Sequence, residues 1–172
     1  MKRNQILNCI PKSSVSLVEN LIKDDNVTIK IVKVRKTKHG DFKKFRDGSS
    51  QITLNHIDNK YRFLITLIHE LAHFRVDRNL MRRVKPHGIE WKKTFQLLML
   101  PFLNNTIFPD KILSNLANYL KNPSATTDSN IELVISLSKY DPVSNTVFLF
   151  DILNETLFQH NENKIYKKIS KL

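Results

Sequence analysis

The spacing of apolar residues before residue 60 predicts one helix and three strands. Residues 14–23 repeat apolar side chains at helical intervals, so they predict a short helix. Apolar and polar residues alternate from Val27 to Arg35, as they do in a strand with one buried face. Turn residues then set off two further stretches, 41–46 and 51–55, which predict strands that return along the first. We therefore expect a small antiparallel sheet.

After the third strand the apolar residues follow the period of a helix. From Phe63 to Phe74 they cover most of the helix circumference, which indicates that this helix is buried. A basic loop is expected at residues 79–87. Two more helices are predicted beyond it, over residues 89–100 and 109–120, each with a proline near one end.

The last quarter of the chain has a different pattern. Residues 122–130, NPSATTDSN, have the composition of a linker. The alternation typical of strands then returns in three stretches, at residues 131–138, 146–151 and 155–159. We therefore expect an α+β core over residues 1–121, followed by a small β-rich appendage over residues 131–172 that ends in a basic tail.

The composition is that of a folded protein without disulfide bonds. The chain has 172 residues, of which 41% are hydrophobic, and this is enough to bury a core. Its single cysteine, Cys9, excludes an intramolecular disulfide and a four-cysteine zinc ribbon. The first apolar run breaks at Asn8 and is too short for a signal peptide, and no stretch is long enough to cross a membrane. We expect a soluble cytoplasmic protein with no membrane partner.

The positive charge is concentrated in the middle of the chain. The net charge is +12, and residues 26–93 carry 17 basic and six acidic side chains. Such a segment favours a polyanionic partner, nucleic acid before an anionic membrane surface, and a solvated basic face is the alternative. Nucleic-acid binding would place the protein at the nucleoid. The candidate nucleic-acid residues are Lys30, Lys33, Arg35, Lys36, Lys38, Lys43, Lys44 and Arg46 on the first two strands, and Arg75, Arg78, Arg82, Arg83 and Lys85 on the long helix and its following loop.

The run His69-Glu70-Leu71-Ala72-His73 lies within the buried helix and carries the clearest chemistry of the sequence. Residues four apart on a helix share a face, so His69 and His73 can bind one metal ion. Glu70 can then reach a water on that metal without being a ligand, as a metalloprotease requires. The alternative is two core histidines that are satisfied by hydrogen bonds. A metal would satisfy both histidines of so apolar a helix at once.

A catalytic zinc ion needs a third protein ligand. Asp77, His87 and Glu90 are the downstream candidates. Asp77 lies one turn past His73 on the same helix, too near along the axis to complete a tetrahedron. His87 stands between a proline and a glycine, after a loop long enough to reverse the chain. We predict His87 as the ligand, with Glu90 as the alternative.

Several spaced motifs resemble the SprT-like family, which includes the Spartan-type proteases. They are IHELAHFRV, the segment PHGIEWK that places His87 fourteen residues after His73, VRKTKHGDF at 34–42, and ITLN at 52–55. The resemblance covers roughly residues 10–121. It implies a zincin-like core, one zinc ion per chain on His69, His73 and His87, and Glu70 as general base.

The resemblance also implies a function. It predicts a zinc-dependent endopeptidase that acts on proteins associated with or crosslinked to DNA. One alternative is a non-catalytic zinc protein that regulates at nucleic acid, against which the intact Glu70 argues. The other is a general peptidase with no nucleic-acid role. Sequence alone does not decide between DNA and RNA.

The sequence departs from the family in one feature and leaves the oxyanion-stabilising residue undetermined. Many SprT-like proteins carry a cysteine-rich zinc ribbon after the catalytic domain, and this chain has no cysteine beyond Cys9 to build one. No side chain is singled out to stabilise the oxyanion, for which Tyr61, Tyr119, Tyr140 and Tyr166 are all candidates. We expect His39, next to Gly40, to be a surface residue, with substrate contact as the alternative, and Trp91 to be a packing residue.

Overall fold

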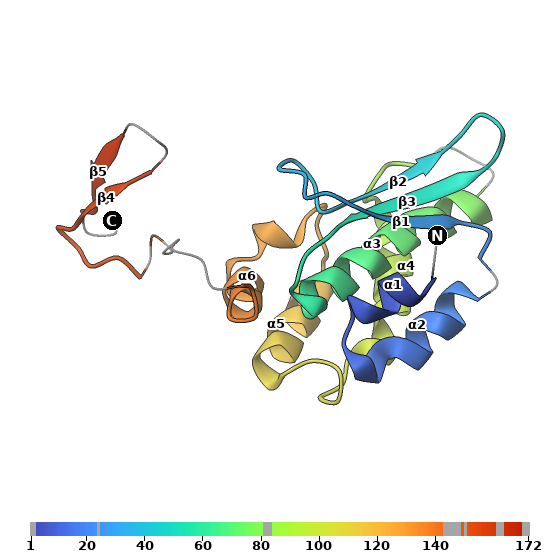
Figure 1. Cartoon of the computed structure of the whole chain (residues 1–172), viewed down its shortest axis with the longest axis horizontal. Coiled ribbons are helices and arrows are strands. Elements are labelled where there is room, and N and C mark those ends of the chain that lie inside the picture. The colour runs from blue at the N-terminus through green and yellow to red at the C-terminus, as the bar shows by residue number, and fades with distance from the viewer. Residues whose placement is uncertain are drawn as a thin grey trace. The chain divides into compact units, whose positions relative to one another are not determined.

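The computed structural model describes residues 3–23, 25–80, 84–142, 149, 151–160 and 164–169. The chain divides into two compact units, residues 1–142 and 143–172, which Figure 1 shows together and which are described separately below. The sequence leads us to expect a core that ends at residue 121 and a linker at 122–130, whereas the first compact unit extends to residue 142. None of the described helices is long and apolar enough to cross a membrane.

The first unit is an α+β structure, as the apolar pattern predicts. Four of its helices match predicted segments, and two, α1 and α6, do not. The helices are α1 (Arg3–Asn8), α2 (Val15–Ile22), α3 (Lys60–Asn79), α4 (Ile89–Met99), α5 (Asp110–Leu120) and α6 (Ile131–Ser138), with short 3₁₀ turns η1 (Lys12–Ser14), η2 (Leu100–Phe102) and η3 (Thr127–Ser129).

The sheet of this unit is mixed, so the predicted antiparallel sheet is wrong. Its strands are β1 (Thr28–Val32), β2 (Gly40–Lys44) and β3 (Ser50–Asn55), in the order β1-β3-β2. β3 runs parallel to β1 and antiparallel to β2. The physical reason is burial: β3 hides Ile52 and Leu54 completely, while β1 and β2 each keep more exposed positions. The strand with the greatest apolar content therefore takes the centre.

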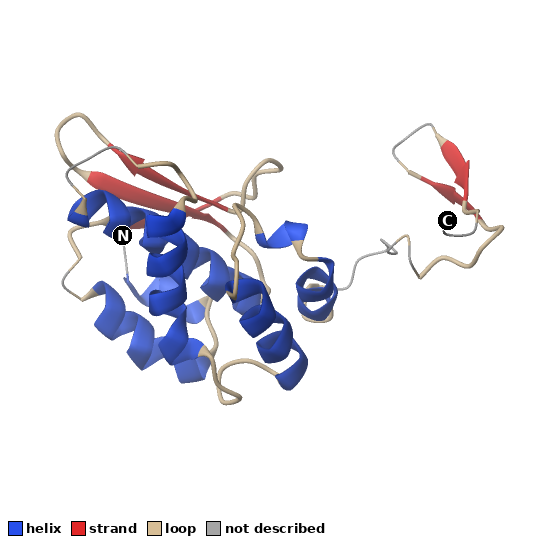
Figure 2. Cartoon of the chain, turned by 180° about the vertical axis from the view of Figure 1, so that it is seen from behind, coloured by secondary structure: helices blue, strands red, loops and turns tan. Residues whose placement is uncertain are grey.

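The helix α3 lies against this sheet and forms the centre of the core. Ten of its residues between Phe63 and Val76 are buried, and it packs on β2, β3 and α4. Figure 2 shows the helices gathered on one face of the sheet. At its start, the side chain of Asn59 accepts a hydrogen bond from the N–H of Arg62 and donates to the carbonyl of Leu137. This capping residue joins α3 to the end of α6.

The strand predicted at residues 131–138 is wrong, because this segment forms α6. The side chain of Asn130 caps the helix by accepting from the N–H of Leu133. Leu133, Ser136 and Leu137 are buried at helical spacing. The segment before it is ordered too: Pro123 is buried, and Thr126 accepts from the N–H of Asp128 at the start of η3.

The second unit holds one described hairpin. β4 (Leu157–Gln159) pairs antiparallel with β5 (Ile165–Lys167), and Phe158 stacks on Tyr166 at 5.8 Å between ring centroids. The strand predicted at 155–159 is therefore confirmed in part. The strand predicted at 146–151 lies mostly outside the described residues, as does the end of the basic tail.

Candidate metal centre

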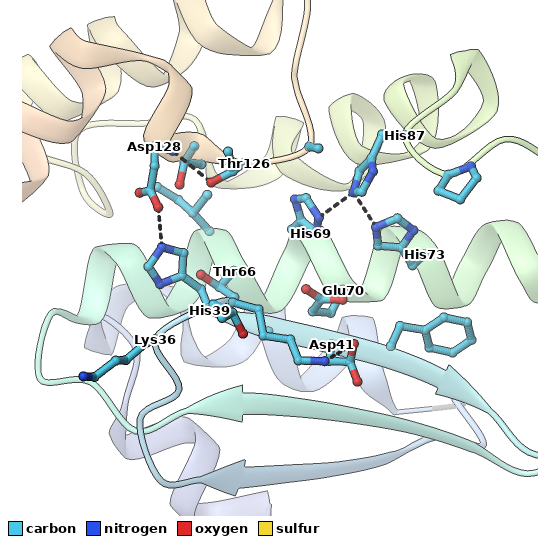
Figure 3. Close-up of a pocket in the computed structure, with 18 residues that line it drawn as sticks. Lys36, His39, Asp41, Thr66, His69, Glu70, His73, His87, Thr126 and Asp128 are labelled. Carbon is cyan, nitrogen blue, oxygen red and sulfur yellow. Dashed lines mark hydrogen bonds and ion pairs between the residues drawn. The ribbon is translucent and has the colours of Figure 1, made fainter.

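The helix α3 presents His69 and His73 on one side, with their ring centroids 5.1 Å apart. They point away from the core toward the loop that precedes α4, as Figure 3 shows. Trp91 on α4 lies behind them. Its buried ring stacks on His73 at 5.3 Å, and its indole N–H donates to the carbonyl of His69 at 3.4 Å. The expectation that Trp91 packs in the core is confirmed.

His87 reaches the pair from the loop before α4. The loop turns through the N–H of Gly88, which donates to the carbonyl of Lys85, and His87 itself takes the left-handed φ of 56°. Its Nε2 lies 3.2 Å from Nε2 of His69 and 2.9 Å from Nε2 of His73. Three nitrogens that converge in this way can hold a metal ion.

The alternative ligands lie elsewhere. Asp77 forms an ion pair with Lys44 at 2.8 Å. Glu90 is not part of the metal-competent cluster of the described residues, which consists of the three histidines. A tetrahedral metal ion takes four ligands. Three imidazoles leave a fourth position for water or substrate.

The surroundings keep the three imidazoles neutral, which is the form that binds metal. Burial lowers the pKa of His69 to about 3, helped by the nearby charges of His73, His87 and His39. Burial and the charge of His87 lower the pKa of His73 to about 4. Burial also lowers the pKa of His87. Each imidazole therefore offers a free electron pair at neutral pH.

Glu70 points from α3 toward β2 and is buried, with 6% of its surface exposed. Burial, followed by the charge of Asp41, raises its pKa to about 8. Arg35 and Lys38 and a hydrogen bond from the backbone N–H of Phe42 act in the opposite direction. The carboxyl group is therefore held beside the edge of the sheet and close to the histidine cluster, in surroundings that give it affinity for a proton.

These residues line one cleft of about 570 Å³. Its walls come from four segments: the loop and strand at 36–42, residues of α3 between 65 and 73, the turn at Pro86 and His87, and residues 125–128. The last segment belongs to the stretch expected to be a linker. It contributes Asp128, a residue that sequence reasoning did not identify because nothing in its local pattern differs from a polar loop.

His39 lines the same cleft, and its side chain is 37% exposed, so it lies at the surface as expected. Contact with substrate, the alternative, stays a prediction. Its Nε2 lies 2.7 Å from Oδ2 of Asp128. The four tyrosines do not line this cleft. Tyr61 packs edge-on against Tyr140 at 4.9 Å, the hydroxyl of Tyr119 donates to Ser124, and Tyr166 belongs to the second unit.

Several of the candidate nucleic-acid residues have partners within the fold. Arg35 donates to Asn55 and Thr53, and Arg75 and Arg78 both lie 3.0 Å from Asp25. Two of the lysines, Lys38 and Lys44, pair with Asp41 and Asp77. Arg82 and Arg83 lie outside the described residues. The exposed remainder is Lys30, Lys33, Lys36, Lys43, Arg46 and Lys85.

A scan against models of protein families finds no match to this chain, and a search of curated proteins finds none either.

Proposed function

We propose that this protein is a zinc-dependent endopeptidase of the SprT-like type. The observation that carries the proposal is the position of Glu70, which is buried between the edge strand β2 and a cluster of three converging histidines. A metal site that is only structural has no need of an acid–base group beside its open position. Here that group lines the same open cleft as the three histidines.

In this proposal His69, His73 and His87 hold the zinc ion. When bound, zinc supplies Lewis acidity: it lowers the pKa of a bound water and polarises the scissile carbonyl. Glu70 takes the proton of the attacking water as the new carbon–oxygen bond forms. It then delivers this proton to the amide nitrogen as the carbon–nitrogen bond breaks. The raised pKa of Glu70 suits the second step, delivery of the proton. For the first step Glu70 must be ionised, a form that the positive charge of a bound zinc ion would favour.

The substrate chain would pair with β2. The neighbouring strand β3 is central and has no free edge, so it cannot accept a further strand. In β2 the backbone N–H and C=O groups of the odd-numbered residues point toward β3. The hydrogen bonds at both ends of the strand show this: the N–H of Asn55 donates to the carbonyl of His39, and the N–H of Phe45 donates to the carbonyl of Ser49. Gly40 and Phe42 therefore turn their backbone groups toward the cleft, where an extended peptide can add as a further strand. The N–H of Phe42 already donates to Glu70, so both groups of Gly40 and the carbonyl of Phe42 are the ones left for a peptide.

We also propose that the substrates are proteins held on nucleic acid. Support comes from exposed cations on the sheet and its connecting loops, of which Lys36, in the loop between β1 and β2, lines the cleft. The internal pairing of Arg35, Arg75 and Arg78 reduces the charge available, so the nucleic-acid part of the proposal rests on fewer side chains than the sequence suggests. A peptidase with no nucleic-acid role is the second candidate, and this pairing favours it.

The decisive experiment combines metal analysis with cleavage. Purified protein should hold about one zinc per chain and should cleave casein, and a chelator should abolish cleavage until zinc is restored. Glu70→Gln should keep its zinc and lose about two or more orders of magnitude in rate, the effect of losing a general base. Single-stranded DNA should accelerate cleavage of a DNA-binding protein. Full activity of Glu70→Gln would exclude the mechanism.

A further inference from the structure

His39 and Asp128 meet at one end of the cleft, although 89 positions separate them in the sequence. His39 comes from the residue before β2, and Asp128 comes from η3. Figure 3 shows their side chains directed at each other beside Thr66, with His69 and His73 further along the same helix. Since both residues line the cleft, this pair is open to whatever occupies it.

The carboxylate of Asp128 is held from two sides before any ligand arrives. Its Oδ1 lies 3.6 Å from Nη1 of Arg62, whose other nitrogen Nη2 lies 3.1 Å from Asp141. The N–H of Asp128 donates to the side chain of Thr126. The hydrogen bond with His39 is the largest of the effects that lower the pKa of Asp128, so the carboxylate stays ionised. Oδ2 is thus fixed as the acceptor for the imidazole.

This arrangement leaves one nitrogen of His39 for a ligand. Nε2 donates to Asp128, so Nδ1 is available, and in the protonated imidazole it carries a second N–H. When protonated, His39 also acts on the histidine cluster, where its charge contributes to the low pKa of His69. A negative charge that develops on a substrate in the cleft would therefore be stabilised by His39.

We propose that His39 is a further catalytic residue, which donates a hydrogen bond from Nδ1 to the oxyanion formed on the scissile carbonyl, and that Asp128 is the positioning residue that orients it. This inference rests on the proposed peptidase function. The two flanking cations are less suited: Lys38 is paired with Asp41, and Lys36 is an exposed, flexible side chain. A role of the pair in stability alone would be small, because both side chains are more than a third exposed.

The test compares an oxyanion mimic with the uncleaved substrate. The mimic is a peptide phosphonamidate, whose tetrahedral anion imitates the oxyanion. Its Kd for the zinc-loaded protein is measured by calorimetry, and the Kd of a fluorescent substrate peptide is measured in a Glu70→Gln background. His39→Gln should weaken phosphonamidate binding and kcat/KM by about 100-fold, the effect of one lost oxyanion donor, while substrate binding changes by less than about threefold. Asp128→Asn should change the same quantities in the same direction by a smaller factor.

His56→Gln is the matched control, because His56 is exposed and lies outside the cleft. Zinc content and thermal stability are measured for each variant, and His39→Asn serves if His39→Gln does not fold. If wild-type protein neither cleaves nor binds the phosphonamidate, the proposed function is overturned and the inference with it. If wild-type protein cleaves and both His39 variants match it in kcat/KM and phosphonamidate affinity, only the role of His39 is overturned. Equal losses in substrate and phosphonamidate binding would reduce His39 to a substrate-binding residue and also overturn it.

Discussion

A side chain on Gly40 would collide with Glu70: a Cβ atom built on this glycine lies 2.6 Å from Oε1 of the carboxyl group and 2.7 Å from its Cγ. The backbone N–H of the next even-numbered residue, Phe42, donates to the same carboxyl group. The edge strand therefore determines where the acid–base group can lie, and only a residue without a side chain permits this approach.

Gly40→Ala should accordingly damage catalysis more than folding. We expect a fall in kcat/KM of about 100-fold, since a displacement of about 1 Å in a catalytic group has effects on that scale. Zinc content should be unchanged. The measurement is peptide cleavage together with metal analysis, with Thr28→Ala on the exposed face of β1 as control. A Gly40→Ala protein with wild-type kcat/KM would show that Glu70 tolerates displacement.

Removal of any metal ligand should cost both zinc and stability. His69→Ala, His73→Ala and His87→Ala should each hold well under one zinc per chain and should unfold at lower temperature than wild-type protein with zinc, because bound metal stabilises only the folded state. Asp77→Ala and Glu90→Ala are controls that should retain zinc. Retention of zinc by His87→Ala together with its loss from Glu90→Ala would show that the third ligand is Glu90.

Acid should destabilise the metal-free protein below about pH 6.5, the usual pKa of histidine. The pKa values of His69 and His73 in the fold are about 3 and 4, so the unfolded chain binds more protons than the folded one between those values and 6.5. Stability should therefore fall as pH falls through this window. Glu70 opposes this trend with one proton against two, because its pKa of about 8 lets the folded state hold a proton that the unfolded state lacks. Urea unfolding at pH 5 and pH 7 with a chelator measures the effect, and His69→Leu should reduce it. An equal unfolding free energy at both pH values would contradict the expectation.

Binding to single- or double-stranded DNA should weaken steeply with salt. A log–log slope of about −3 to −6 corresponds to a handful of phosphate contacts, with little dependence on sequence. Lys33→Glu combined with Arg46→Glu should flatten the slope, because both side chains are exposed in the basic segment. Lys111→Glu combined with Lys121→Glu makes the same charge change on and after α5 and should leave the slope alone. Fluorescence anisotropy across a salt series decides; no binding at low salt would remove nucleic acid from the proposal.

Local sequence predicted the parts of the site that one helix builds. His69 and His73 share a face of α3 because they are four residues apart, and Glu70 is the neighbour of His69. His87 is predicted because it stands between a proline and a glycine after a loop long enough to reverse the chain. Asp128 could not be found in this way, since its partner His39 lies in a distant segment and only the fold brings them together.

The errors in the fold have related causes. The β-branched residues Ile131, Val134 and Ile135 suit a strand as well as a helix, and packing on α5 together with the Asn130 cap decides for α6. The parallel pairing joins β1 to β3, and β2 lies between these two strands in the sequence. Such a pairing leaves no mark in the alternation of either strand. Both outcomes depend on tertiary contacts rather than on local preference.

The helix α3 is anchored at both ends. Asn59 ties its first turn to Leu137 and Asp141, and Arg75 and Arg78 tie its last turns to Asp25. Two of the three histidines are thus pre-oriented by the scaffold, and their chelating geometry exists before any ion arrives. The conformational entropy lost when the metal binds then falls mainly on one loop residue, His87. Changes in the short turn around His87 can therefore alter the affinity for metal and leave the helix unchanged.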